Sequence, residues 1–445
     1  MNKDQHEVQM QAILGQSKSA RSEFWKSLDF HEPSKGSLRT DTKKGEFLLS
    51  PDSSLNNGPP PVICEIDSIQ KLKKLTGCDD SLFDLGVFSS EELEFPVWDS
   101  TYDHTVWKDL PARWKAILCR VCQAYIYGDS RKVAAYEDVL NRKYFPMKIA
   151  CFTGESIVVT KDHPLIIDPG SSPYPVVLHY DSITLEEGAK IISKKGALVH
   201  LESDYLRQEG RPDMKGSFVF TGEGGGDGGD GGDGGDGAQG AKGADGGSKS
   251  AGEKGSNGTA GHDGGNGSNG IAGSNPTPVS MSVATIKGDV LVASYGGKGG
   301  NGGDGGEGGQ GGKGGTGGKD GGDGAGEGGN GGNGGKGGKG GKGAAGGSGA
   351  NVTIHYWTLD GSVQLIQSPD PHEGLGGNGG SGGKGGKGGV GGDGGSSSVA
   401  GGTGGTPGAS GEGGTAGNHG AMGKVILVHD EENRVTVLVP ADRNS

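Results

Sequence analysis

Residues 296–319 read GGKGGNGGDGGEGGQGGKGGTGGK, a run in which two glycines and one variable residue repeat every three positions. The pattern returns as GGNGGKGGKGGK in 331–342 and as GGNGGSGGKGGKGGVGGDGG in 376–395. Between 222 and 273, every third residue is glycine except Lys249. The dimensions of a flexible linker depend on its length and composition and not on a period. The strict register therefore predicts an ordered structure with three residues per turn.

A helix with three residues per turn has the polyproline II geometry, which lacks internal hydrogen bonds and must pair its backbone with neighbours. Two glycines in three would let neighbouring helices approach closely, while the third side chain faces solvent about every 9 Å. One straight run of 296–319 would span about 74 Å. A compact arrangement therefore requires the chain to fold back, and we expect reversals at 248–251, 320–327 and 396–400.

Proline-free GGX runs of this kind resemble the polyglycine II bundles of the snow flea antifreeze protein and of some phage tail-tip adhesins. The resemblance covers residues 223–423, and the N-terminal half resembles no family that we recognise. It implies a rigid scaffold and, for the adhesin type, loops at the tip that recognise host surface receptors. The charged residues at the variable positions depart from the small, flat face expected for ice binding.

Two other structures fit the glycine-rich half. The sequence GAQGAKGAD in 237–245 fits the Gly-X-Y pattern of a collagen-like homotrimer. However, 222–273 contains no proline, on which collagen stability usually depends. A disordered chain is the second alternative, because the region has few large apolar side chains to bury. The periodicity favours the bundle over both.

Composition excludes several classes of protein. The chain has 445 residues and 99 glycines, of which 85 fall within 223–423, and its formal net charge is −13. No basic face that would bind nucleic acid is visible. The N-terminus lacks the apolar core of a cleaved signal peptide, and no run of about 18 apolar residues predicts a membrane span. We expect a cytoplasmic protein, or one that reaches the outside or a particle by a non-classical route.

The sequence before the glycine-rich half divides by its patterns. Residues 1–60 are polar and end in a linker, 61–150 are mostly helical, and 151–222 carry short apolar runs typical of strands. Within 61–150 the apolar spacing predicts a clear amphipathic helix over 111–128. The stretch LEEGAKIISKKGALVHLES, residues 185–203, is similar in texture to the rungs of a β-solenoid.

Apolar strand pairs recur inside residues 223–445 at intervals of roughly 70 residues. They lie at 279–295, 351–367 and 424–439, and turn-forming residues in the middle of each predict β-hairpins. The expected fold class is therefore mixed: an α-rich N-terminal module, a short-strand β-rich unit, and a C-terminal polyglycine II helix bundle with interspersed β-hairpins.

Candidate ligand contacts are few. His355, Tyr356 and Trp357 form the only aromatic cluster amid the glycine-rich runs, and Tyr295 ends the preceding apolar segment. Aromatic rings on a rigid scaffold suit contacts with a glycan or receptor. Successive residues of a strand point to opposite faces, so at least one of Tyr356 and Trp357 is expected to pack against the sheet instead.

Other motifs predict no chemistry. The acidic ladder that begins at Asp227 places its carboxylates about 9 Å apart, too far to share a calcium ion, so we interpret it as solvated charge. Cys119 and Cys122 form one CxxC without a second pair, which favours packing over metal or redox work. The string CFTGESIVVT from Cys151 resembles the start of a Hint domain, but His163 is too close in sequence to match that family. We expect no metal and no cofactor.

These observations favour a non-enzymatic structural or adhesive protein. Its N-terminal module would attach to a protein partner, and its rigid glycine-rich scaffold would present a surface to a cell-surface receptor or glycan. One alternative is a toxin or enzyme with activity in 61–222 and the glycine-rich half as a stalk. Another is a self-assembling filament or matrix subunit, which would be a homo-oligomer.

Overall fold

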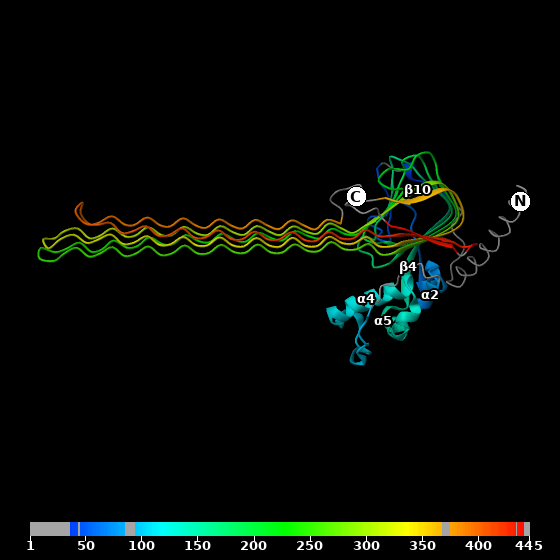
Figure 1. Cartoon of the computed structure of the whole chain (residues 1–445), viewed down its shortest axis with the longest axis horizontal. Coiled ribbons are helices and arrows are strands. Elements are labelled where there is room, and N and C mark those ends of the chain that lie inside the picture. Colours follow the sequence, from blue (N-terminus) through cyan, green and yellow to red (C-terminus); the bar gives the residue numbers. More distant parts are fainter. Residues whose placement is uncertain (1–35, 43–44, 85–93, 367–373, 433, 440–445) are drawn as a thin grey trace, which may run out of the picture.

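The computed structural model of the chain consists of one curled sheet, a layer of short helices and a long glycine-rich rod (Figure 1). It describes residues 36–42, 45–84, 94–366, 374–432 and 434–439. The rod runs away from one side of the sheet, and helices α2, α4 and α5 lie beside the sheet at its base. Residues 1–35 of the polar N-terminal segment lie outside the described residues.

Thirteen strands form one mostly parallel sheet that curls into a half-barrel. Its main path runs in the order β1, β4, β6, β8, β10, β9, β7, β5, β2, while β11, β12 and β13 extend from β10, and β3 pairs with β4. The strands are β1 (Ser37–Arg39), β2 (Phe47–Leu49), β3 (Val62–Ile66), β4 (Met147–Val159), β5 (Leu165–Ile167), β6 (Val176–Leu185), β7 (Ile191–Ser193), β8 (Leu198–Gln208), β9 (Phe218–Thr221), β10 (Val279–Tyr295), β11 (Val352–Leu365), β12 (Val425–His429) and β13 (Arg434–Leu438).

The helices are short and lie mainly between β3 and β4 in the chain. They are α2 (Ile69–Thr76), α3 (Ser81–Asp84), α4 (Ala112–Tyr127) and α5 (Glu137–Tyr144), with 3-10 turns at Thr40–Thr42, Ser100–Tyr102, Trp107–Asp109 and Ser130–Tyr136. Helix α2 ends at Gly77, whose φ of 67° suits the left-handed conformation that glycine adopts without steric cost.

The inner face of the half-barrel holds the main core. Parallel pairing places one apolar residue of each successive strand in line: Phe152, Leu178, Leu201, Met281, Ile354 and Leu427. All six side chains belong to one buried cluster. Because each strand buries its apolar positions against the strands before and after it, the stack supplies the neighbours that such short strands need.

The helical layer covers part of the outer face of the same sheet. A second buried cluster joins Leu118 and Val121 of α4 to Ile149, Val177 and Val199 of the strands. Helices and strands thus share one core, and β3 pairs antiparallel with the first half of β4.

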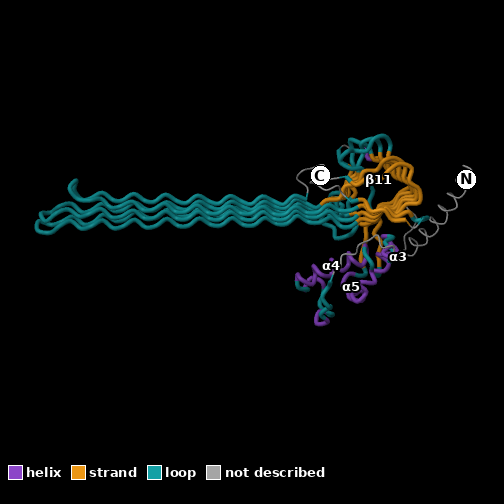
Figure 2. Tube along the Cα trace, in the orientation of Figure 1, coloured by secondary structure: helices purple, strands orange, loops and turns teal. Residues whose placement is uncertain are grey.

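The expected fold class is wrong. An α-rich module, a separate β-rich unit and a polyglycine II bundle do not describe this chain, because its ordered framework is one mostly parallel sheet with few helices. Strand β1 pairs with β4, and β2 pairs with β5. The early residues 37–49 therefore belong to the same sheet as the strands that follow the helices. The glycine-rich residues lie outside the sheet as long loops (Figure 2).

Two of the three predicted hairpins are also wrong. Residues 279–295 form the single strand β10, and most of 351–367 forms the single strand β11, which pair in parallel from end to end. Gly288 and Gly361 stand opposite each other with φ values of 91° and 136°. The positive φ does not reverse the strand at these positions, because parallel neighbours already supply its hydrogen-bond partners. Only 424–439 forms a hairpin, from β12 and β13.

Candidate functional site

The glycine-rich rod is the most prominent feature outside the sheet. We define it as the three loops 222–274, 296–349 and 374–423, which connect β9 to β10, β10 to β11 and β11 to β12. Strands β10, β11 and β12 pair in parallel, so all three loops leave the sheet at neighbouring positions. Each loop runs out along the rod and returns, which places its reversal at the far end (Figures 1 and 2).

Backbone hydrogen bonds between loops hold the rod together. The outward segment 296–319 donates from the Gly300 N–H to the Ile271 carbonyl and from the Gly302 N–H to the Asn378 carbonyl, at 2.9 and 2.8 Å. The same pattern repeats every three residues. The middle segments 296–319 and 326–349 each pair with four neighbouring segments, which explains why both are nearly unbroken GGX.

Glycine is required in the rod wherever a neighbour's backbone approaches. A Cβ added at Gly302 would lie 2.0 Å from the Gly341 carbonyl oxygen, and one at Gly335 would lie 1.9 Å from that of His262. At Gly232, which faces outward on the first segment, an added Cβ meets nothing within 4 Å. The spacing of glycine in the sequence therefore indicates which edges of each segment pack against the backbone of a neighbouring segment.

The variable residues do more than face solvent. Asp and Asn side chains of one segment accept hydrogen bonds from backbone N–H groups of the next. Four aspartates of the first segment do so at 2.6–2.8 Å, in the pairs Asp227 with Asn301, Asp230 with Asp304, Asp233 with Glu307 and Asp236 with Gln310. The interpretation of this ladder as solvated charge missed these bonds. The signal in the sequence is that acceptors recur 73 to 77 residues before their donors, close to the length of the repeat.

Replacing Asp233 with alanine should loosen one rung of this ladder. The Glu307 N–H then loses its acceptor, and a net contribution of about 1 kcal/mol corresponds to roughly fivefold faster amide exchange there. Hydrogen exchange of residue 307 measures the effect. Lys313→Ala is the matched control, because the Lys313 side chain makes no hydrogen bond or ion pair within the described residues. Equal exchange in the two variants would contradict the structural role of the aspartates.

The four predicted contact residues do not form one surface. Tyr356 points into the core of the half-barrel and is 6% exposed, with its ring 5.1 Å from that of His429. His355, on the opposite face of β11, is 8% exposed, and Trp357 is partly buried. Tyr295 lies at the end of β10, 6% exposed. Ligand contact by these residues stays a prediction, and Trp357 is the most exposed of the four.

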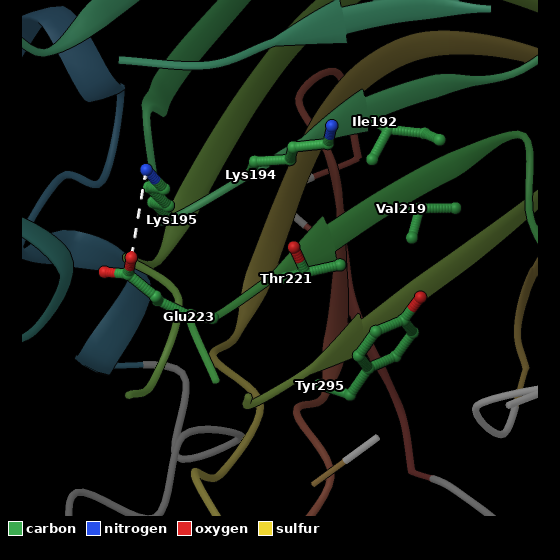
Figure 3. A pocket seen from close by; sticks show the side chains of 8 residues that line it. Ile192, Lys194, Lys195, Val219, Thr221, Glu223 and Tyr295 are labelled. Carbon is green, nitrogen blue, oxygen red and sulfur yellow. Dashed lines mark ion pairs between the residues drawn. The ribbon is translucent and has the colours of Figure 1, made fainter. Parts of the chain in front are cut away.

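Tyr295 lines a shallow cavity at the base of the rod (Figure 3). The cavity has a volume of about 320 Å³. Its lining combines apolar and charged side chains: Ile192, Lys194, Lys195, Val219, Thr221, Glu223 and Tyr295, with Gly222. Lys195 Nζ lies 3.8 Å from a Glu223 carboxylate oxygen, an ion pair that spans one side of the cavity. The two lysines and the tyrosine in this lining are side chains of the kind that bind anionic or hydroxylated ligands.

A polar cluster that sequence reasoning missed lies between the sheet and the helical layer. We call it the imidazole cluster, and it consists of His179, His200, Glu202, His355 and Asp430. His355 Nδ1 lies 3.0 Å from Asp430 Oδ1, and His179 Nδ1 lies 3.3 Å from Glu202 Oε2. His200 Nδ1 lies 3.2 Å from the Ser280 hydroxyl, which donates to the carbonyl of Thr76 at the end of α2. His179 lies on β6, His200 and Glu202 on β8 and His355 on β11, and Asp430 follows β12, so no local sequence motif indicates the cluster.

The pKa values of the cysteines shift in both directions, and the hydrogen bond with the Cys151 thiol lowers the pKa of Cys64 below its usual value. Burial raises the pKa of Cys122 to about 12. The Cys64 thiol and burial raise the pKa of Cys151 well above its usual value. Cys119 is exposed, with its sulfur 3.3 Å from the Tyr144 hydroxyl. Among the described residues no group of three or more His, Cys, Asp and Glu side chains is arranged to hold a metal ion.

Comparisons with known proteins add one weak similarity. A scan against protein-family models and a search of curated proteins give no match. Among solved structures, the chain is similar to an antifreeze protein of the springtail Granisotoma rainieri, described as a nine polyproline type II helical bundle. The two are 30% identical over 39% of this chain and 94% of the springtail chain, with a TM-score of 0.07. A TM-score this low supports no inference about the fold or the function of this chain. Within the described residues, no helix has the length and apolar character needed to cross a membrane.

Proposed function

We propose that this chain is a non-enzymatic structural or adhesive protein that uses the rod to hold a recognition surface away from the sheet. The tip of the rod, formed by the three reversals at 247–251, 320–325 and 396–401, would contact a receptor or glycan. The helical layer would attach the chain to a protein partner. The contacts that support this proposal are the backbone hydrogen bonds that join all three loops along the rod.

The shape of the rod supports a role in presentation more than one in catalysis. Its interior is filled by backbone, and its side chains form rows on the outside, so the rod offers no enclosed site for a small substrate. Pairing of neighbouring segments on several sides makes the rod stiffer than a single extended chain. A stiff rod keeps the tip at a fixed distance from the sheet, as presentation of a surface requires.

Binding of the full chain to an array of neutral and acidic oligosaccharides, and to whole cells, tests the proposal. The tip variant carries Lys249→Ala, Asp323→Ala and Ser397→Ala, three exposed residues at the reversals. The matched control carries Lys313→Ala, Lys387→Ala and Thr415→Ala, three exposed residues along the sides of the rod. We expect the tip variant to lose at least tenfold in affinity and the control to bind like the parent. Absence of any binding, or equal loss in both variants, would contradict recognition at the tip.

A further inference from the structure

The sequence contains eight Asn-Gly pairs, and seven of them lie in the rod. The asparagines are Asn57, Asn257, Asn266, Asn269, Asn301, Asn330, Asn333 and Asn378. Asparagine is a thermolabile residue, and a following glycine makes it more so, because no Cβ hinders the approach of the glycine nitrogen to the asparagine side chain. Whether a given pair reacts then depends on how the fold holds these two groups.

Seven of the eight pairs are held by what we call the Asn clamp. In each of them one facing residue donates its backbone N–H to the asparagine Oδ1, and its carbonyl accepts the N–H of the following glycine. At Asn330, the Thr403 nitrogen lies 3.0 Å from Oδ1, and the Gly331 nitrogen lies 2.8 Å from the Thr403 carbonyl oxygen. The facing residues are Leu48 for Asn57, Asn330 for Asn257, Lys339 for Asn266, Lys342 for Asn269, Asn378 for Asn301, Thr403 for Asn330 and Thr406 for Asn333.

Asn378 is the exception. Its side chain is exposed and forms no hydrogen bond with any described residue, and the Gly379 N–H has no acceptor in that part of the chain either. The cause is its place in the rod. Hydrogen bonds lead from the segment 222–247 to 296–319 and from there to 374–395, with no described segment beyond it to supply a facing residue.

We propose that Asn378 is a site of spontaneous covalent modification in the folded chain, where it loses ammonia and becomes aspartate or isoaspartate, while the Asn clamp protects the other seven asparagines. The Gly379 nitrogen attacks the side-chain carbonyl carbon of Asn378, and the new C–N bond closes a five-membered succinimide ring. The side-chain amide leaves as ammonia and takes the proton of the Gly379 nitrogen. Water then opens the ring at either carbonyl, so that one water is consumed for each ammonia released.

The clamp opposes this reaction at both of its ends. It engages the glycine N–H, whose nitrogen must attack, and it fixes the asparagine carbonyl, which must turn toward that nitrogen. Two further hydrogen bonds must therefore open before a clamped pair can react. With the usual net value of a hydrogen bond, this makes reaction at a clamped pair roughly thirtyfold slower than at Asn378.

The two products have different consequences for the rod. Aspartate leaves the backbone of the segment unchanged. Isoaspartate inserts one carbon atom into the backbone, so the residues after 378 move out of register with their neighbours. The bonds from the Gly380 N–H to the Gly341 carbonyl and from the Gly305 N–H to the Ser381 carbonyl, both 2.8 Å, are the first to be affected.

Peptide mass spectrometry of the full chain, aged in mildly alkaline water labelled with heavy oxygen, tests the proposal. Four asparagines stand in the same five residues, Gly-Gly-Asn-Gly-Gly, so local sequence cannot separate them: Asn301, Asn330, Asn333 and Asn378. In the folded chain we expect Asn378 to take up label roughly thirtyfold faster than the other three. In urea, where the clamps are absent, we expect all four to react at similar rates.

Two variants on one rung of the rod separate the clamp from the position in the chain. The Ser381 N–H donates to Asp304 Oδ1 at 2.6 Å, and the Ser381 carbonyl accepts the Gly305 N–H at 2.8 Å. Ser381→Asn and Asp304→Asn each create the same Gly-Gly-Asn-Gly-Gly sequence. The first lies on the unclamped segment and should react as fast as Asn378, whereas the second keeps Ser381 as its clamp and should react as slowly as Asn301.

Equal rates at the four parent asparagines in the folded chain would overturn the proposal. So would an Asn378 that reacts in urea but is as slow as Asn301 in the folded chain. A slow Ser381→Asn site, or an Asp304→Asn site as fast as Asn378, would show that the clamp does not control the reaction.

Discussion

Replacing Gly302 with alanine is expected to disrupt the rod over several residues on either side. The new Cβ would lie 2.0 Å from the Gly341 carbonyl oxygen, a distance that real Cβ atoms do not show, so the segments must move apart by more than 1 Å. Several hydrogen bonds with 326–349 and 374–395 would lengthen together, each with a net value of about 1 kcal/mol. We therefore expect a local loss of about 3 kcal/mol.

Limited proteolysis with a non-specific protease measures this loss, because cleavage of the rod requires local opening. A change of about 3 kcal/mol corresponds to cleavage more than a hundredfold faster when opening is in fast equilibrium. Gly232→Ala is the matched control: it makes the same chemical change on the same rod, but its Cβ meets nothing within 4 Å. Equal cleavage of the two variants would mean that close packing of backbones does not hold the rod.

Replacing Met281 with alanine should destabilise the whole sheet. Met281 is fully buried at the centre of the inner line of apolar residues, between Leu201 on β8 and Ile354 on β11. Removing its side chain costs the transfer free energy and leaves a cavity, together about 2–5 kcal/mol. Urea unfolding followed by circular dichroism measures the change in the free energy of unfolding.

Lys287→Ala, on the same strand but exposed, is the control for Met281→Ala and should change the free energy of unfolding by less than about 0.5 kcal/mol. Strand β10 also anchors two of the rod loops. Met281→Ala should therefore lower the urea concentration at which protease begins to cleave the rod. A fall in sheet stability that leaves the rod unaffected would show that the rod stands independently of the strands that carry it.

Local patterns were the most predictable part of this fold. The apolar spacing in 111–128 predicts a helix, and α4 spans Ala112–Tyr127. The positions of most apolar strand segments were also predictable, as β10 and β11 show. The direction of pairing was not. A Lys-Gly-Asp or Asp-Gly sequence is typical of a turn. Whether the chain reverses there depends on whether neighbouring strands already form hydrogen bonds with its backbone.

Two further features could not be predicted, because each joins residues that lie far apart in the sequence. The aspartate ladder needs knowledge of which segment lies next to the first, because Asp227 and Asn301 are 74 residues apart. The imidazole cluster brings His200, His355 and Asp430 together through the parallel pairing of four strands, β8, β10, β11 and β12. His355 was predicted to be an exposed contact residue because aromatic residues follow it in the sequence. Only the folded structure shows that it lies on the face of β11 that α2 covers.

Small-angle X-ray scattering of the full chain tests the central claim, that the three glycine-rich loops form one stiff rod. We expect an elongated particle with a maximum dimension of roughly 100 Å or more, since each segment of about 25 residues spans up to about 80 Å beyond the sheet. The scattering should also show the constant cross-section of a rod. A compact chain of this length has a radius of gyration of about 22 Å. A value near 22 Å, or a coil-like profile without a rod cross-section, would contradict the account.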